Sequence, residues 1–240
     1  MNNKLMIIIV IFIIVLTIIT MRYNDGILNG AFNTDAGFIV VLDPGHGGID
    51  GGAESAEGIA EKDINLCIAL ELKSLLEEEG VKVIMTRDED VGLYNDEGNA
   101  AIRTLKTQDM HKRKEIIDSA DADLAVSIHL NSFSQDANVR GAQVFYPGQG
   151  DAVLISKSKI AAELMQEDFN STLNNEKKRV ALQKDDVFIL HNVTCPLVIA
   201  ECGFLSNRDE AAMLSNHAYQ GNIAKTLKIS ICRYLENNCG

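Results

Sequence analysis

Residues 38–48 read FIVVLDPGHGG. The first five side chains are apolar and three of them are β-branched, which is typical of a strand that is buried on both faces of a sheet. Asp43, Pro44 and the glycines then turn the chain sharply and place His46 just past the carboxyl end of that strand. Ligand sites in open α/β sheets lie at this edge, so we expect His46 to face a functional site.

The glycine run does not match a dinucleotide-binding loop. Such a loop follows a strand directly and has the pattern G-x-G-x-x-G. If Gly45 and Gly47 are taken as its first two glycines, the third falls at position 50, where the chain has Asp50. The next predicted helix begins near Glu61, too far along the chain for a tight phosphate turn, so this class of site is excluded.

Short apolar runs and helical patterns alternate along the rest of the chain. The runs predict strands at 38–43, 81–86, 123–129, 142–146 and 196–202. Helices are predicted at 61–79, 109–120, 153–173 and 217–237, with Asn207 as the cap of a further helix at 208–214. This alternation predicts one three-layer α/β domain, whose largely parallel or mixed sheet carries helices on both faces. The polar stretch 87–108 is predicted to be a long functional or mobile loop.

Composition and charge narrow the class of protein. The 240 residues are 46% hydrophobic and 23% charged, which is typical of a globular domain and excludes a disordered chain. Five cysteines without a C-x-x-C pair argue against a disulfide framework and against a four-cysteine zinc site. The 34 acidic side chains outnumber the 22 basic ones, and the resulting net charge of -12 argues against nucleic acid as a partner.

The N-terminal segment is predicted to lie outside the fold. Residues 5–21 read LMIIIVIFIIVLTIITM, long enough for an apolar helix of about 25 Å. Both a cleaved export signal and an uncleaved membrane anchor fit, and the lack of small residues for cleavage favours the anchor. We divide the chain into a signal peptide or anchor at 1–22, a linker at 23–37 and a domain at 38–240. Both a signal and an anchor predict an exported protein. If the segment is not cleaved, the N-terminus is expected to associate with the membrane.

Two further strands bring ionisable side chains to the same edge of the sheet. His129 closes the third predicted strand, and Glu201 lies at the end of the fifth. Glu61 begins the first helix on the same side, so we expect these side chains and His46 to converge. Two histidines and one glutamate form the three-ligand set of a catalytic zinc site. Glu201 then remains as a free carboxylate that can take a proton from water.

Each of these residues also has an ordinary structural explanation. A histidine that follows a strand is commonly a loop or core residue, and Glu61 could simply complement the dipole of its helix. Glu201 is harder to explain in this way, because burying an unpaired carboxylate on an apolar strand costs free energy. Together the four positions favour a metal site, although the residues alone leave both explanations open.

Five segments carry a resemblance to a known family. The segments VVLDPGHGG, EKDINL, TRDED, ADLAVSIHLNS and PLVIAECGFLSN resemble, in order and spacing, the family 3 N-acetylmuramoyl-L-alanine amidases over about residues 38–238. Those enzymes are zinc hydrolases that cut the amide between the lactyl group of N-acetylmuramic acid and the L-alanine of the peptidoglycan stem peptide. The resemblance implies one Zn²⁺ per chain, held by His46, Glu61 and His129, with Glu201 as the catalytic glutamate.

Some details resemble the germination-specific members that act in spore cortex maturation. These details are the long segment before His129, Leu130 and the run DDVFILHN at 185–192. The subtype implies muramic-δ-lactam formation in the cortex and a location at the outer face of the membrane, the cell wall or the forespore envelope. The family also implies an activating or regulatory protein partner, for which the segment 87–108 is the expected contact.

Three further residues are candidates for contacts with peptidoglycan. Asn131 matches an asparagine of the family, and Arg179 and Lys184 could pair with carboxylates of the stem peptide. Asn131 could instead be an ordinary turn residue, and Arg179 could belong to a solvated run of charged residues. Two other functions stay open at this point: a zinc carboxypeptidase that acts on stem peptides, and a non-catalytic protein that binds the cell wall.

Overall fold

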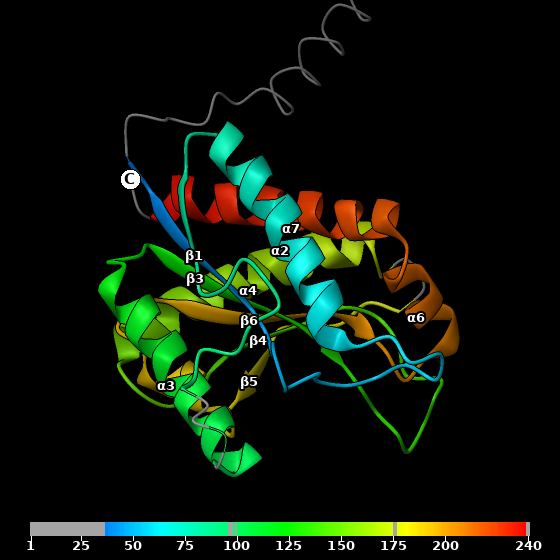
Figure 1. The fold of residues 1–240 in the computed structure, drawn as a ribbon. Coiled ribbons are helices and arrows are strands. Elements are labelled where there is room, and N and C mark those ends of the chain that lie inside the picture. The colour runs from blue at the N-terminus through cyan, green and yellow to red at the C-terminus, as the bar shows by residue number, and fades with distance from the viewer. Residues whose placement is uncertain (1–36, 96–97, 99, 175–176, 239–240) are drawn as a thin grey trace, which may run out of the picture. The chain divides into compact units, whose positions relative to one another are not determined.

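Six strands form one mixed sheet in the computed structural model, which describes residues 37–95, 98, 100–174 and 177–238. The strands are β1 (Ile39–Pro44), β2 (Lys82–Met85), β3 (Leu124–Asn131), β4 (Gln143–Pro147), β5 (Leu182–Lys184) and β6 (Leu197–Phe204). Their order across the sheet is β2-β1-β3-β6-β4-β5 (Figure 1). Only β4 and β6 pair in antiparallel fashion among these strands. The predicted largely parallel, mixed sheet is therefore confirmed.

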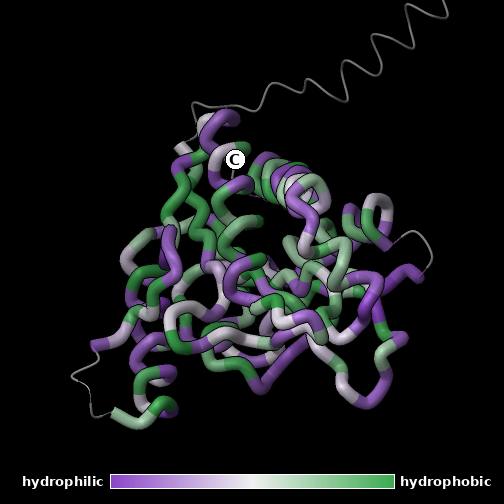
Figure 2. Tube along the Cα trace, turned by 45° about the vertical axis from the view of Figure 1, so that its right-hand side comes forward, coloured by the Kyte–Doolittle hydropathy of each residue, from purple (hydrophilic) through white to green (hydrophobic). Residues whose placement is uncertain are grey.

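Helices cover both faces of this sheet. They are α2 (Glu61–Glu78), α3 (Ile102–Ser119), α4 (Ala152–Thr172), α5 (Phe188–Asn192), α6 (Arg208–Leu214) and α7 (His217–Asn238). The helix α7 packs against both α2 and α4 on one face, and α3 lies on the other face (Figure 1), where α5 packs against it. Figure 2 shows hydrophobic and hydrophilic residues alternating along the helices, as expected for elements with one buried side. The three-layer α/β architecture agrees with the prediction.

The central strands are apolar on both faces because both faces are covered. Val41 of β1, Ala125 of β3 and Ile199 of β6 pack with Ile117 of α3 and Ile189 of α5 in one buried cluster. The residues that alternate with them project to the other face, where α2 packs on β1 and β3. This double burial explains why the strands appear in the sequence as continuous apolar runs.

Short or polar segments of the structure differ from the predicted elements in two respects. The helix expected at 109–120 begins at Ile102, so the predicted loop 87–108 ends at Ala101. The first turns of α3 bury only Leu105 and therefore show no apolar period. The strand β5 and the helix α5 were not predicted, since three and five residues are too short for a period to show. The bounds of the other predicted elements agree to within two residues, and Asn207 caps α6 as expected.

The described residues all fall within one compact unit. The apolar segment predicted at 5–21, and with it the boundaries at 1–22 and 23–37, lies outside the described residues except for Gly37. Among the helices that are described, none has the length and hydrophobicity that a membrane span requires.

A buried ion pair joins the end of β1 to α3. Asp43 is 2% exposed and its carboxylate accepts hydrogen bonds from Arg113 Nη1 at 2.6 Å, Ser127 Oγ at 2.6 Å and Thr86 Oγ1 at 2.7 Å. Burial by itself would raise the pKa of this carboxyl, but the Arg113 charge and the three hydrogen bonds lower it to about 2. The ionised form therefore stabilises the packing of α3 and β3 at the end of β1.

We expect Asp43→Asn to remove stability that depends on pH. Because the folded-state pKa lies below the unfolded value of about 3.9, the carboxylate contributes about 2 kcal/mol above about pH 5, and this contribution is lost as the pH falls toward about 2. The variant should be about 3 kcal/mol less stable near neutral pH, since Arg113 also loses a buried partner. Urea unfolding at several pH values measures this difference.

The difference between wild type and Asp43→Asn should shrink as the pH falls. Asp209→Asn is the matched control, because Asp209 is exposed in the first turn of α6. It should show no comparable pH dependence. A stability difference for Asp43→Asn that stays constant from about pH 5 to about pH 2 would contradict this account.

Candidate metal centre

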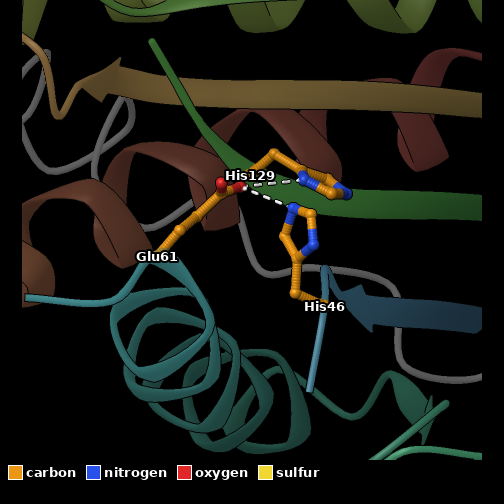
Figure 3. Close-up of side chains that lie close together, drawn as sticks. All are labelled: His46, Glu61 and His129. Atoms are coloured by element: carbon orange, nitrogen blue, oxygen red, sulfur yellow. Dashed lines mark hydrogen bonds and ion pairs between the residues drawn. The ribbon is translucent and has the colours of Figure 1, made fainter. Parts of the chain in front are cut away.

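Two histidines and one glutamate point toward one another at the carboxyl edge of the sheet (Figure 3). His46 lies in the loop after β1, Glu61 is the first residue of α2, and His129 lies near the end of β3. One ligand atom from each lies within 4.8 Å of the others. The Oε1 atom of Glu61 is 3.0 Å from His129 Nδ1 and 3.3 Å from His46 Nε2.

This donor set fits a zinc ion. Zinc in proteins binds imidazole nitrogen and carboxylate oxygen at about 2.0–2.1 Å, and tetrahedral ligands at that distance lie about 3.3 Å apart. The two separations from Glu61 Oε1 are close to that value. The three side chains would leave the fourth position of a tetrahedral ion for water or substrate.

The carboxylate of Glu61 is fixed by its neighbours. Its Oε1 atom also accepts hydrogen bonds from the backbone N–H of Leu130 at 3.0 Å and from Asn65 Nδ2 at 3.3 Å, and Oε2 accepts from the N–H of Ala53 at 2.8 Å. Burial alone would raise the pKa of Glu61, but the two facing histidines hold it well below its usual range. The side chain is therefore an anionic ligand in a set orientation.

His46 is held through both its ring and its backbone. Its Nδ1 atom is 2.9 Å from Asp50 Oδ2, and Lys106 Nζ lies 2.7 Å from the other oxygen of Asp50. Burial would lower the pKa of His46, but the hydrogen bonds to Asp50 and Glu61 raise it to about 9. The backbone of His46 has a φ of 62°, which is uncommon outside glycine and costs free energy unless its surroundings fix it.

Two arginines fix the loop that carries His46. Arg87 donates from Nε to the carbonyl of Pro44 at 3.0 Å and from Nη2 to the carbonyl of Gly45 at 2.9 Å. Arg113 donates to the carbonyls of Pro44 and His46. Both arginines are buried. Three successive carbonyl groups are thus bound by two guanidinium groups, which explains how the unusual backbone of His46 is maintained.

Glu201 lies beside the three other side chains and is less constrained. It pairs in register with His129 across β3 and β6. Within the described part of the chain its buried Oε2 atom has no hydrogen-bond partner. Burial, and then the nearby Glu61 charge, raise the pKa of Glu201, and the charge of His129 only partly opposes this. The two carboxylates of the site therefore differ in environment: both oxygens of Glu61 accept hydrogen bonds, whereas Oε2 of Glu201 has no partner among the described residues.

The structure shows contacts within the protein for the three remaining predicted residues, and the charge of Lys184 acts on the carboxyl of Glu201. A hollow of about 200 Å³ opens beside His46 and His129, and its lining contains neither Asn131, Arg179 nor Lys184. Asn131 ends β3 and accepts from the N–H of Ser132. The guanidinium of Arg179 donates to the carbonyl of Arg140 and to Gln143, and it stacks on the ring of Phe204. Lys184 lies 4.8 Å from the centre of the Phe145 ring.

The residues that support the metal ligands carry no clear signal in the sequence. Arg87 and Asn65 stand in the segments TRDED and EKDINL, where their side chains had no assigned role. Asp50 appeared only as the residue that breaks the dinucleotide pattern. Arg113 lies in a helix rich in charged residues, and nothing in its local pattern distinguishes a buried arginine from a solvated one.

Gly45 sets how closely the loop approaches His129, so we expect Gly45→Ala to weaken metal binding about 10- to 100-fold. A Cβ atom at this position would lie 2.2 Å from His129 Cε1 and 2.6 Å from Nδ1, which forces the ring to move. Gly51→Ala is the control, because a Cβ there meets nothing closer than 4.0 Å. Zinc titration against a competing chelator measures both variants. Equal affinities for Gly45→Ala and Gly51→Ala would show that this contact does not position the ring.

The chain that carries this site is similar to a known protein family and to known proteins. A family model described as N-acetylmuramoyl-L-alanine amidase matches residues 40–233. A germination-specific N-acetylmuramoyl-L-alanine amidase of Bacillus subtilis (strain 168) is 36% identical over 199 residues, which are 83% of this chain and 80% of that protein. The part of this chain that the family model matches includes His46, Glu61, His129 and Glu201.

Solved structures show the same likeness. The CwlD amidase from Clostridioides difficile, solved in complex with the GerS lipoprotein, aligns with a TM-score of 0.78 at 39% sequence identity and covers 83% of this chain and 98% of its own. An N-acetylmuramoyl-L-alanine amidase from Clostridium difficile 630 aligns with a TM-score of 0.71 at 26% identity, covering 85% of this chain and 99% of that one.

Proposed function

The chain belongs to the family of N-acetylmuramoyl-L-alanine amidases, and from this premise we propose that it cleaves peptidoglycan with a zinc ion held by His46, Glu61 and His129. The observation that carries the proposal is the convergence of these three donors beside Glu201, whose Oε2 atom is buried without a partner among the described residues. The bond cleaved is the amide between the lactyl group of N-acetylmuramic acid and L-alanine.

The zinc ion, when bound, would supply a Lewis acid that polarises the lactyl carbonyl and lowers the pKa of water toward neutrality. Glu61 contributes the negative charge of the ligand set, and its hydrogen bonds from Leu130, Asn65 and Ala53 hold it in place. The loop of His46 is held by the two arginines described above. The protein thus presents the donors in a preset arrangement.

Glu201 is the residue that moves the proton. Its free oxygen can accept a proton from the attacking water, and burial keeps its pKa raised, which favours holding that proton. The oxygen of the water bonds to the lactyl carbonyl carbon, the carbon–nitrogen bond breaks, and Glu201 returns the proton to the leaving nitrogen. The products are a lactyl carboxylate and a peptide with a free L-alanine amino group.

We propose residues 38–240 as the catalytic domain, 1–22 as a signal peptide or membrane anchor and 23–37 as a linker. Peptidoglycan is extracytoplasmic, so this division agrees with export to the outer face of the membrane, the cell wall or the forespore envelope. The likeness to the germination-specific amidase of Bacillus subtilis supports a role in spore cortex maturation and muramic-δ-lactam formation.

A protein partner is also proposed, and the structure solved with the GerS lipoprotein supports it. The segment 87–95 touches the loop of His46: Asp90 Oδ1 accepts from the N–H of Gly48 at 2.9 Å, and the hydroxyl of Tyr94 accepts from the N–H of Ile49 at 3.1 Å. A partner that binds this segment would therefore affect the position of His46, a proposed zinc ligand.

Product analysis tests the proposed reaction. Purified peptidoglycan is digested with the zinc-loaded protein, and the soluble products are identified by mass spectrometry. The amidase releases whole stem peptides that begin with L-alanine. A carboxypeptidase would release only the last residue of the stem, and a protein that only binds the wall would release nothing although zinc is bound. Either of these two results would overturn the proposed function.

A further inference from the structure

A second hollow adjoins the metal centre. It has a volume of about 480 Å³ and lies between the first turns of α3 and the start of α5. Its lining includes Ile102, Arg103, Lys106, Met110, His111 and Phe188. Two of these residues, Lys106 and Met110, also line the hollow at His46 and His129. We call the second hollow the α3–α5 groove; Lys106 and Met110 stand between it and the hollow at the metal centre.

The walls of the α3–α5 groove are apolar and open. The side chains of Ile102, at the start of α3, and Phe188, at the start of α5, are large and apolar. Ile102 is nevertheless 63% exposed and Phe188 is 36% exposed. The ring of Phe188 lies edge-on to His111, with centroids 4.9 Å apart, so α3 and α5 form a fixed wall. Such a surface suits small apolar side chains better than the hydroxyl-covered faces of a sugar chain.

Two positive charges stand along the same groove in a protein of net charge -12. Lys106 is paired with Asp50, which in turn contacts His46, so its charge faces the metal centre. Arg103 lies three residues earlier on α3 and makes no ion pair with any part of the chain that the structure describes. Its guanidinium is free to bind a carboxylate of a ligand in the groove.

We propose that the α3–α5 groove binds the stem peptide of peptidoglycan and that Arg103 pairs with a free carboxylate of that peptide. The proposal rests on the proposed amidase function, because it is the cleavage at the metal centre that places the L-alanine end of the stem beside Lys106 and Met110. The alanine methyl groups then face Met110 and Phe188, and an acidic residue of the stem reaches Arg103. The glycan extends from the opposite side of the scissile bond.

The test measures how fast the zinc-loaded full chain cleaves each of two soluble substrates. Both are muramoyl peptides with a three-residue stem; one has free stem carboxylates and the other has carboxamides in their place. The quantity measured is the ratio of kcat/KM for the acid over the amide. We expect wild type to favour the acid about five- to tenfold, which corresponds to one partly exposed ion pair. Arg103→Gln should bring the ratio close to one, and Arg103→Glu should invert it.

Lys159→Gln is the matched control, since it removes one positive charge from an exposed position on α4, on the other face of the sheet. It should keep the wild-type ratio. The proposal is overturned if the ratio is unchanged in both Arg103 variants, if Arg103→Gln slows both substrates equally, or if stem-free glycan fragments inhibit the wild type but not Arg103→Gln. If the wild type cleaves neither substrate, the amidase function itself fails, and the assignment of the groove with it.

Discussion

Glu201→Gln is expected to lower the rate of amide cleavage by about 1,000-fold or more. The neutral amide keeps the size of the side chain but can no longer accept a proton from water or return it to the leaving nitrogen, a role that contributes about 10²–10⁴ in rate. The Oε2 atom of Glu201, which has no hydrogen-bond partner among the described residues, is the basis on which we propose it for this role. Mass spectrometry of released stem peptides over time measures the rate.

Zinc content separates a catalytic role of Glu201 from a role in metal binding. Glu201→Gln should bind about one zinc ion with the affinity of the wild type, because the three proposed ligands are unchanged. A variant that cleaves at the wild-type rate would show that another group transfers the proton. A variant that loses zinc together with activity would show that Glu201 is a ligand.

His129→Ala is expected to lose zinc and activity together. Removal of one imidazole leaves only two donors, and we expect the zinc affinity to fall by more than about 100-fold, since even the outer residues that orient metal ligands contribute 10- to 100-fold. Metal analysis after dialysis measures the loss. The side chain of His129 is 24% exposed, so the variant loses little buried apolar area and is expected to fold.

His217→Ala is the matched control for His129→Ala. His217 is exposed at the start of α7, and its ring contacts Gln220 rather than the metal centre. This control should keep both zinc and activity. If His129→Ala retained one zinc ion of unchanged affinity, the proposed set of His46, Glu61 and His129 would be wrong.

The sequence contains enough to predict the sheet and the edge at which the site lies. Strands that are buried on both faces appear as continuous apolar runs, and an ionisable residue at the end of such a run has few structural explanations. This is why His46, His129 and Glu201 could be singled out, and the structure indeed brings the first two together with Glu61. The parallel register of β1, β3 and β6 produces this convergence.

What could not be predicted depends on contacts between residues that are far apart in sequence. Arg113 is separated from Asp43 by 70 residues, and only the packing of α3 on the sheet brings them together. The start of α3 at Ile102 was missed because its first turns bury little apolar surface. The same exposed turns line the α3–α5 groove, so the segment with the weakest pattern is the one that we propose contacts the substrate.

Arg179 illustrates how a residue type can mislead. A guanidinium is well suited to bind a carboxylate, which made Arg179 a candidate for the stem peptide. In the structure its donors are engaged by Arg140 and Gln143 within the protein. Its substrate role remains a prediction, whereas Arg103 lines the α3–α5 groove and makes no ion pair within the described part of the chain.

The most direct test of the central claim is the position of the zinc ion in crystals of the zinc-loaded protein, determined by anomalous diffraction at the zinc absorption edge. The account predicts one strong peak within about 2.0–2.2 Å of a donor atom from each of His46, Glu61 and His129, with Glu201 unbound beside it. A peak at other side chains, or one in which Glu201 replaces any of the three as a ligand, would contradict it.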